Sequence, residues 1–218
     1  MTTPTVLSIQ VGLPAAHGAD SISTNTWESG IFKHPVEGRV WMDTLNLRGD
    51  GQHDLKNHGG VNRAALAYGA AHYPAWRDEL DRPDFPYGAF GENFTVSELT
   101  ESSVFLGDVY AVGEARVLVT QPRWPCWKLA RRWNIKDLTA RVERKGWGGW
   151  YQRVLQPGYI QAGDTYELLE RSYPQYSVAL LNDLMAGRME DSSLLSALAQ
   201  VEALSPEWRK VFAGRVQG

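Results

Sequence analysis

The sequence predicts a mainly β domain with short helices over residues 1–172, followed by a small module of three helices over residues 173–218. Two observations predict the β domain. The chain has 21 glycines and nine tryptophans in 218 residues, and its apolar runs are short and separated by turn residues. This combination is typical of β structure with tight turns rather than of a helical bundle. The module is predicted by a change after Ser172, where apolar residues begin to recur at helical spacing.

The predicted strands are short segments with alternating or continuous apolar residues. Pro35 has no backbone donor, so the strand that contains it is expected at an edge of the sheet. A Gly107-Asp108 turn is expected to break one strand, and residues 116–120 are strongly β-branched. The expected strands are 6–11, 30–36, 39–47, 64–68, 104–112, 116–120, 151–155, 159–160 and 164–169.

Helices are expected over 73–81, 128–133 and 136–144, with Pro74 tolerated in the first turn of the first one. In the C-terminal module, apolar residues recur at helical spacing in 178–185 and 194–201. A last helix is predicted from Ser205, with this residue as the N-cap and Pro206 at the first helical position. The amphipathic stripes of these helices indicate that they cover one face of the β domain or support a homodimer.

Composition and charge exclude several classes of function. The formal net charge is -3, which gives no overall positive field to attract nucleic acid or an acidic membrane surface. The N-terminal segment has no basic region followed by an apolar one, and no apolar run reaches the roughly 18–20 residues of a membrane helix. One cysteine cannot form an internal disulfide. We therefore expect a cytoplasmic protein with no nucleic-acid and no membrane partner.

The strongest candidate for chemistry is Cys126, the single cysteine, in the segment Gln-Pro-Arg-Trp-Pro-Cys-Trp-Lys-Leu of residues 121–129. Two prolines stiffen the loop, which lowers the entropy cost of holding a ligand. Arg123 and Lys128 flank the thiol, and positive potential favours the thiolate that binds metals. A buried structural cysteine is the competing interpretation.

A zinc ion held by protein ligands alone is not predicted. Such a site needs three or four Cys, His or carboxylate ligands at recognisable spacing, whereas here two histidines, His53 and His58, lie near each other without a further ligand motif. A single thiolate is sufficient as the protein ligand if a cofactor supplies the remaining ligands.

Three further segments are candidates for a binding site. His58-Gly59-Gly60 is followed by Asn62 and Arg63, and glycines that let the backbone approach a ligand stand here beside a guanidinium suited to phosphate. Glu92 and Asn93 place a carboxylate beside an amide, which suits hydrogen bonding or proton transfer. Lys33 is suited to an anion. Ordinary turns and a solvated lysine are the alternatives for these segments.

Together these segments resemble the MOSC family, named after the C-terminal domain of molybdenum cofactor sulfurase, and its YiiM-like branch in particular. The likeness spans most of residues 5–170, and the three-helix tail resembles the extra module of that branch. The matching segments are Lys33-His34-Pro35-Val36, Arg48-Gly49-Asp50-Gly51, His58-Gly59-Gly60 with Arg63-Ala64, Phe90-Gly91-Glu92-Asn93-Phe94, 121–129, Gly148-Gly149-Trp150-Tyr151 and 158–164. This chain has a histidine inserted before Pro35, and Val61-Asn62 where the family often has proline or aspartate.

The resemblance implies a β-barrel-like domain with a cleft for the molybdenum cofactor, molybdopterin with its metal; the family is also associated with pyridoxal phosphate. By the same resemblance, Cys126 would ligate molybdenum and act in catalysis. The residues implied to hold the pterin and its phosphate are Lys33, His58, Asn62, Arg63 and Arg123. Glu92 and Asn93 are implied in catalysis, as supports of the site or as proton carriers.

The resemblance also implies an activity, the reduction of N-hydroxylated compounds such as 6-hydroxylaminopurine. The electrons would come from a separate flavin-containing reductase, because the sequence shows no nucleotide-binding fingerprint. Two alternatives stay open at this point. The chain would be a carrier of the molybdenum cofactor or of sulfur if Cys126 hands its ligand on, and a non-catalytic interaction module if Cys126 is structural.

Overall fold

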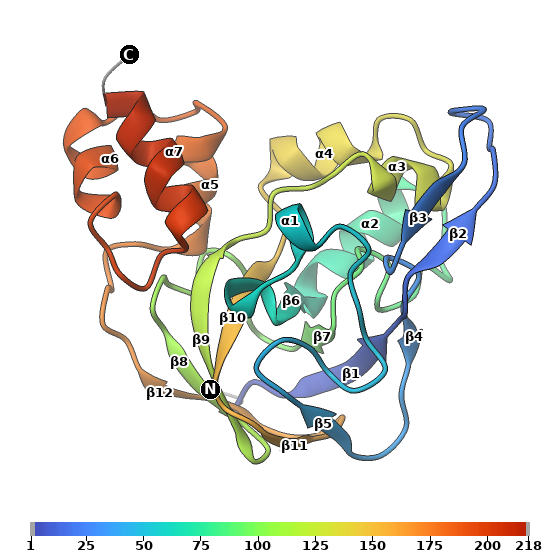
Figure 1. Ribbon diagram of the computed structural model, residues 1–218, viewed down its shortest axis with the longest axis horizontal. Helices are drawn as coiled ribbons and strands as arrows, with labels where there is room; N and C mark the ends of the chain where they lie inside the picture. Colours follow the sequence, from blue (N-terminus) through green and yellow to red (C-terminus); the bar gives the residue numbers. More distant parts are fainter. Residues whose placement is uncertain (1–2, 217–218) are drawn as a thin grey trace.

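The computed structural model describes residues 3–216, and its main feature is a strongly curved sheet. Within these residues, eight strands are paired in the order β12-β8-β9-β10-β6-β7-β1-β4 (Figure 1). Neighbouring strands are antiparallel except β6 and β7, which are parallel. The strands of this sheet are β1 (Val6–Val11), β4 (His34–Pro35), β6 (Ala65–Gly69), β7 (Phe94–Val96), β8 (Val109–Val112), β9 (Ala115–Pro122), β10 (Trp150–Gln156) and β12 (Tyr166–Glu170).

The sheet curls until β12, at one end, reaches the start of β1, which lies next to the other end. Thr5, just before β1, forms an antiparallel bridge with Thr165, just before β12, and the Tyr166 amide donates to the Pro4 carbonyl at 2.7 Å. Register shifts in β1, β10 and β12 mark bulges, which bend and twist strands. The predicted mainly β, barrel-like domain with short helices is confirmed.

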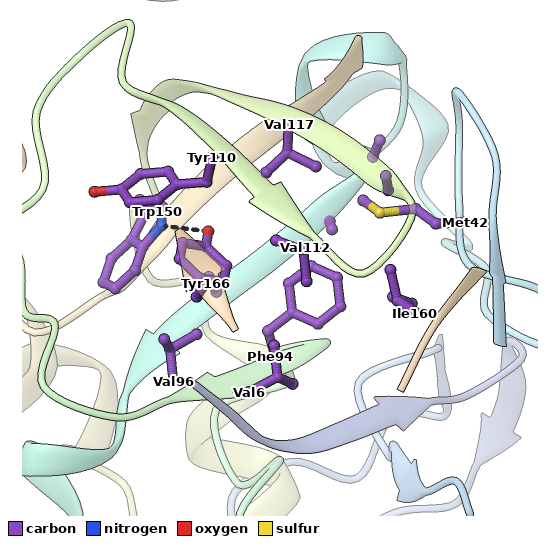
Figure 2. Packing of buried hydrophobic residues seen from close by; sticks show 14 of the residues in the cluster. Val6, Met42, Phe94, Val96, Tyr110, Val112, Val117, Trp150, Ile160 and Tyr166 are labelled. Carbon is purple, nitrogen blue, oxygen red and sulfur yellow. Dashed lines mark hydrogen bonds between the residues drawn. The ribbon is translucent and has the colours of Figure 1, made fainter. Parts of the chain in front are cut away.

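Side chains from the curved strands fill the space that the sheet encloses. Figure 2 shows Phe94, Val112 and Val117 packed against one another with Trp150 and Tyr166 beside them, and all five are buried. The Trp150 indole N–H donates to the Tyr166 hydroxyl at 3.5 Å, so the polar atom of this tryptophan keeps a partner inside the core. Two short ribbons complete the β structure: β2 (Ala15–His17) with β3 (Trp27–Ser29), and β5 (Val40–Met42) with β11 (Gly158–Ile160).

Short helices cover one side of the sheet and form a second core with its aromatic residues. The helices are α2 (Tyr73–Glu79), α3 (Lys128–Trp133) and α4 (Leu138–Lys145), with α1 (Leu55–His58) and the 3-10 turns η1 (Val61–Arg63) and η2 (Ala70–His72). Tyr73, Trp76, Leu129 and Leu138 are all buried in this second core. Among the helices of residues 3–216, none has the length and apolar character needed to cross a membrane.

The C-terminal module contains the three predicted helices, α5 (Val178–Met185), α6 (Ser192–Leu198) and α7 (Pro206–Val216). They form a separate cluster at one end of the molecule (Figure 1). Ser205 caps α7 as predicted, because its hydroxyl accepts the Trp208 amide at 3.4 Å. The helices share a buried cluster with Leu106 and Leu118 of the β domain, so the module covers a face of that domain.

Three predicted strands are shorter than their apolar patterns indicate. In 30–36 only His34–Pro35 pairs, at the edge of the sheet, where the missing donor of Pro35 is harmless. In 39–47 the strand ends at Met42, and the Asp43 amide donates to the Asn46 carbonyl at 2.9 Å to form a tight turn. In 104–112 the predicted break at Gly107-Asp108 is present, because the Asp108 carboxylate accepts the Phe105 amide at 2.9 Å, and the strand is Val109–Val112. In this last segment a side chain that caps a turn outweighs the apolar pattern.

Candidate functional site

A pocket opens between the 29–33 segment, the loop before α1, the loop before β7 and the loop after β9. It brings together six of the eight predicted site residues: Lys33, His58, Arg63, Asn93, Arg123 and Cys126. Backbone of Gly30, Gly51 and Gly91 forms part of its wall. Residues from five separate parts of the sequence therefore meet at one concave surface that contains the thiol.

Cys126 is partly exposed and lies in the turn that leads into α3. The turn is fixed from two sides, because the Cys126 carbonyl accepts the Leu129 amide and the Thr139 hydroxyl, each at 3.1 Å. Burial by itself would raise the pKa of the thiol. A hydrogen bond from His58, the charges of Arg123 and His58, and the Lys128 backbone N–H outweigh burial and lower the pKa to about 7. The thiolate is therefore well populated at neutral pH.

The segment from His58 to Arg63 carries two pocket residues, and its geometry explains its two glycines. Asp54 caps α1 by accepting the Asn57 amide at 3.1 Å, which places His58 at the end of this helix. A Cβ on Gly59 would come within 2.8 Å of the Leu55 carbonyl oxygen, and Gly60 has a φ of +92° that disfavours other residues. The turn directs Arg63 to the pocket, where its guanidinium donates to the Gly59 carbonyl at 3.4 Å.

Arg123 is the most deeply buried cation of the pocket, with 4% of its surface exposed. Its Nη2 donates to the Phe90 carbonyl at 3.1 Å, and its backbone amide donates to the Gly149 carbonyl at 3.0 Å. Nη1 is buried and has no partner among the described residues. An unpaired guanidinium nitrogen in a pocket is costly unless a ligand accepts from it, so this atom indicates an anionic ligand.

Gly148 allows the loop of Arg123 to take this position. A Cβ at residue 148 would lie 2.1 Å from the Arg123 carbonyl oxygen, which is closer than any contact a side chain tolerates. Glu101 holds the next residue, since its carboxylate accepts the Gly149 amide at 2.8 Å.

On the opposite wall, Lys33 pairs with the buried Asp50. The two side chains form an ion pair with exposed fractions of 7% and 0%. Burial lowers the pKa of Lys33, while the carboxylate of Asp50 opposes that shift. Asp50 also accepts the Asn93 side-chain amide at 2.8 Å and the Gly12 backbone amide at 2.9 Å. This carboxylate therefore fixes both predicted pocket residues on this wall.

Glu92 and Asn62 do not line the pocket. Glu92 is fully buried and accepts hydrogen bonds from the Gly88 amide at 2.7 Å, the Phe90 amide at 3.0 Å and the Thr95 hydroxyl at 3.0 Å, with a further one from Tyr73. The carboxylate is thus committed to the loop that supports the pocket wall.

Asn62 lies on η1, where its side-chain oxygen accepts from Arg153 at 2.9 Å and its carbonyl accepts from the Thr120 hydroxyl at 2.7 Å. These contacts tie η1 to β9 and β10. In both Glu92 and Asn62, proximity in sequence to pocket residues does not give proximity of the side chain to the pocket.

Sequence reasoning gave no role to three residues that build the site. Asp50 holds Lys33 and Asn93, Thr139 holds the cysteine turn, and Tyr151 lines the pocket beside Arg123 and Cys126. Burial raises the pKa of Tyr151, and the charge of Arg123 opposes this. Asp50 and Tyr151 lie within segments that match the family, and this match was the one sequence feature that pointed to them. Thr139 lies on a predicted helix, and no feature of the sequence indicated a role for it in the site.

The side chains of the pocket suit a cofactor that itself supplies most of the ligands of its metal. Within residues 3–216, no three His, Cys, Asp or Glu side chains gather as a metal site. Cys126 offers one thiolate, while Arg63, Arg123 and Lys33 offer cationic groups on the surrounding walls. A cofactor with a metal at one end and anionic groups around it suits this arrangement, and the unpaired Nη1 of Arg123 is the observation that tests the fit.

Comparison with known proteins identifies the family and supports the fold. The family model described as the MOSC domain matches residues 54–167, and the one described as the YiiM-like, 3-alpha helix domain matches residues 177–218. The chain belongs to the MOSC domain family. Within that family it is a member of the YiiM-like branch, as the resemblance predicted.

Individual relatives support this assignment over the whole chain. The crystal structure of YiiM from Geobacillus stearothermophilus superposes with a TM-score of 0.81 at 34% identity, covering 98% of this chain and 99% of that one. A Bacillus subtilis protein, described as the uncharacterized protein YflK, is 40% identical over 95% of this chain and 92% of its own length. A Gibberella moniliformis protein named "Reductase" is 38% identical over 79% of this chain but only 31% of its own length.

Proposed function

We propose that this protein is a molybdenum-cofactor-binding oxidoreductase that reduces N-hydroxylated compounds such as 6-hydroxylaminopurine, with the Cys126 thiolate as the protein ligand of molybdenum. One observation carries the proposal. A thiol whose pKa is lowered to about 7 faces a pocket in which a buried guanidinium nitrogen has no partner within residues 3–216. Membership of the MOSC family indicates a function related to the molybdenum cofactor, and the fungal relative named as a reductase supports reduction chemistry.

The overall reaction is balanced by two electrons and two protons. R–NH–OH takes them up to give R–NH₂ and water, with cleavage of the N–O bond. The cofactor, when bound, would supply the redox-active centre for this reduction. The protein supplies the thiolate, orientation and protons.

Each pocket residue has a distinct part in this proposal. Cys126 binds the metal, and Arg123 and Arg63 bind anionic oxygens of the cofactor through guanidinium groups. Lys33 contributes a further cation on the wall held by Asp50. His58, in contact with the sulfur, stabilises the thiolate and can carry a proton at its ring nitrogen. Asn93 lines the pocket beside Asp50, and Glu92 maintains the loop beneath it.

The electrons are proposed to come from a separate flavin-containing reductase. The Gibberella relative supports this division of labour, because the matched part is only 31% of that protein and the remainder is available for another module.

The test compares wild type with Cys126→Ser, both produced in cells that make the molybdenum cofactor. Molybdenum is measured by elemental analysis, and 6-hydroxylaminopurine reduction is assayed with a reduced donor. We expect about one molybdenum per wild-type chain with turnover, and loss of both in the variant. Arg116→Ala, exposed on the same strand that leads to Arg123, serves as the matched control.

The other outcomes identify the alternatives. Stable molybdenum or sulfane-sulfur binding without turnover, with transfer to an acceptor enzyme, would make the protein a carrier. Full biological activity of Cys126→Ser would make it a non-catalytic module.

A further inference from the structure

A broad groove adjoins the Cys126 pocket and shares His53, Asp54 and Lys128 with it. It encloses about 1090 Å³, which exceeds the volume of most small-molecule sites, roughly 300–1,000 Å³. The two depressions therefore adjoin along these three residues, and the groove lies next to the pocket that contains the sulfur. We call this second depression the Trp127 groove.

Trp127 is the most conspicuous residue of the groove. It follows Cys126 directly, yet 53% of its surface is exposed. An exposed indole offers a broad aromatic face and one N–H donor to a ligand. Its position beside the candidate metal ligand means that anything lying on this ring is close to the reacting centre.

The exposed indole is held in place by its neighbours. Its ring lies 5.7 Å from that of Trp27 at an angle of 58°, and the Arg131 guanidinium is 5.7 Å from its centroid. Arg131 is in turn anchored to the segment between β2 and β3, where it donates to the Asn25 carbonyl at 2.8 Å and pairs with Asp20 at 2.5 Å. The β2–β3 ribbon accordingly lies beside α3 (Figure 1). A fixed aromatic surface loses little entropy when a ring stacks on it.

The groove combines an aromatic surface with a carboxylate, which suits a planar ring that carries N–H or amino groups. Four basic residues line it, Lys56, Lys128, Arg131 and Lys136, together with the acidic Glu28 and Asp54, and Arg131 is paired with Asp20. At the junction, Asp54 remains ionised near neutrality, since hydrogen bonds from Asn57 lower the pKa of its carboxyl. A carboxylate there can accept from a ring N–H or an amino group.

We propose that the Trp127 groove binds the planar heteroaromatic ring of the N-hydroxylated substrate, stacked on the Trp127 indole, with the N–OH group directed into the Cys126 pocket. This inference rests on the proposed function for its choice of ligand. It adds a binding site for the ring of that substrate and a specificity-determining residue, Trp127.

Binding of adenine, a non-hydroxylated ring, tests the groove without any turnover. The dissociation constant is measured by equilibrium dialysis for the purified protein and its variants. We expect Trp127→Ala to weaken binding about tenfold, the effect of losing one stacked aromatic partner, and Trp127→Phe to lose no more than about threefold. Trp127→Leu, which keeps an apolar side chain at the start of α3, should behave like the alanine variant.

Trp41→Ala is the matched control. Trp41 is also partly exposed and packs edge-on against Tyr159 at 5.1 Å, but it lies on β5 and lines neither the groove nor the pocket. We expect it to bind adenine like wild type. Wild type that does not bind adenine, or Trp127→Ala and Trp127→Leu that bind as well as wild type, would overturn the proposal.

Kinetics separate this proposal from the proposed function. In Trp127→Ala, kcat/KM for 6-hydroxylaminopurine relative to that for the small aliphatic N-hydroxyurea should fall about tenfold. Absence of all reduction, with adenine binding that still depends on Trp127, would remove the reductase function and leave the ring site. A defect seen only with a protein donor, and not with dithionite, would show that the groove docks the donor and would overturn the ring site.

Discussion

His58 donates a hydrogen bond to the sulfur of Cys126, so a turn before β6 directly controls the ionisation of a thiol that follows β9. The two residues meet because α1 ends at His58, where Gly59 and Gly60 permit a sharp reversal. The contact links the two segments with the strongest sequence signals into one chemical unit. It also gives the first of four predictions.

The Cys126 thiol should titrate with a midpoint near pH 7 in metal-free protein, as its pKa is lowered to about 7. Below this pH the sulfur is protonated and slow to alkylate; above it the rate should rise to a plateau. His58→Ala removes the hydrogen bond and should move the midpoint toward about 8.5. Alkylation by iodoacetamide as a function of pH measures both values. His34→Ala, on the exposed strand β4, is the control, and a wild-type midpoint near 8.5 would contradict the prediction.

Arg123 should be required for holding the cofactor, because its free Nη1 is the buried donor that an anionic ligand satisfies. Arg123→Ala should lower the molybdenum content of protein purified from cofactor-producing cells by tenfold or more, and should raise the pKa of the thiol by removing a neighbouring positive charge. Elemental analysis and alkylation measure the two effects. Arg116→Ala on the same strand should alter neither. Normal molybdenum content in folded Arg123→Ala would exclude this role.

Gly148→Ala should destabilise the protein, since the new Cβ would lie 2.1 Å from the Arg123 carbonyl oxygen and the backbone must shift. The free energy of unfolding should fall by about 1–3 kcal/mol, the usual range for overpacking. Denaturation in urea measures it. At Gly18 a Cβ would have no neighbour within 4 Å, and Gly18→Ala is therefore the comparison. Equal stability of the two variants would show that the loop adjusts without cost.

Glu92→Gln should lower the stability of the fold rather than remove a proton carrier from the pocket. The carboxylate accepts hydrogen bonds from two backbone amides and two hydroxyl groups, and an amide NH₂ in its place would face donors instead of acceptors. We expect a loss of about 1–3 kcal/mol in the free energy of unfolding, measured by thermal or urea denaturation. Unchanged stability together with lost turnover would instead support a direct part in proton transfer.

The segments that the sequence made predictable are those in which local chemistry decides the structure. The β-branched run that becomes β9 and the Ser205-Pro206 start of α7 formed as expected, because their residues favour one conformation and bury one face. The β2–β3 ribbon was not predicted. Its strands are three residues long, and it is held by distant contacts such as the bond from Arg131 to the Asn25 carbonyl.

The residues of the candidate site also differ in how far the sequence could predict them. Residue type and loop stiffness singled out Cys126, Arg123 and the His58 segment, since thiolate, guanidinium and glycine turns carry their chemistry locally. Whether a side chain lines the pocket depends on its hydrogen-bond partners in the folded protein, which the sequence does not show. Glu92 finds backbone donors around it, whereas its neighbour Asn93 finds the Asp50 carboxylate on the pocket wall.

The sequence by itself determined that this chain is a β domain with a helical tail and that it belongs with MOSC proteins, and it singled out one cysteine as the candidate reactive group. Only the tertiary structure decided that His58 and Arg123 surround that sulfur, that Asp50 anchors Lys33, and that an exposed Trp127 borders a groove. The physical reason is that strand propensity and turn chemistry act between near neighbours. The ionisation of a thiol and the partner of a buried charge depend instead on residues that only the folded chain brings within a few ångströms.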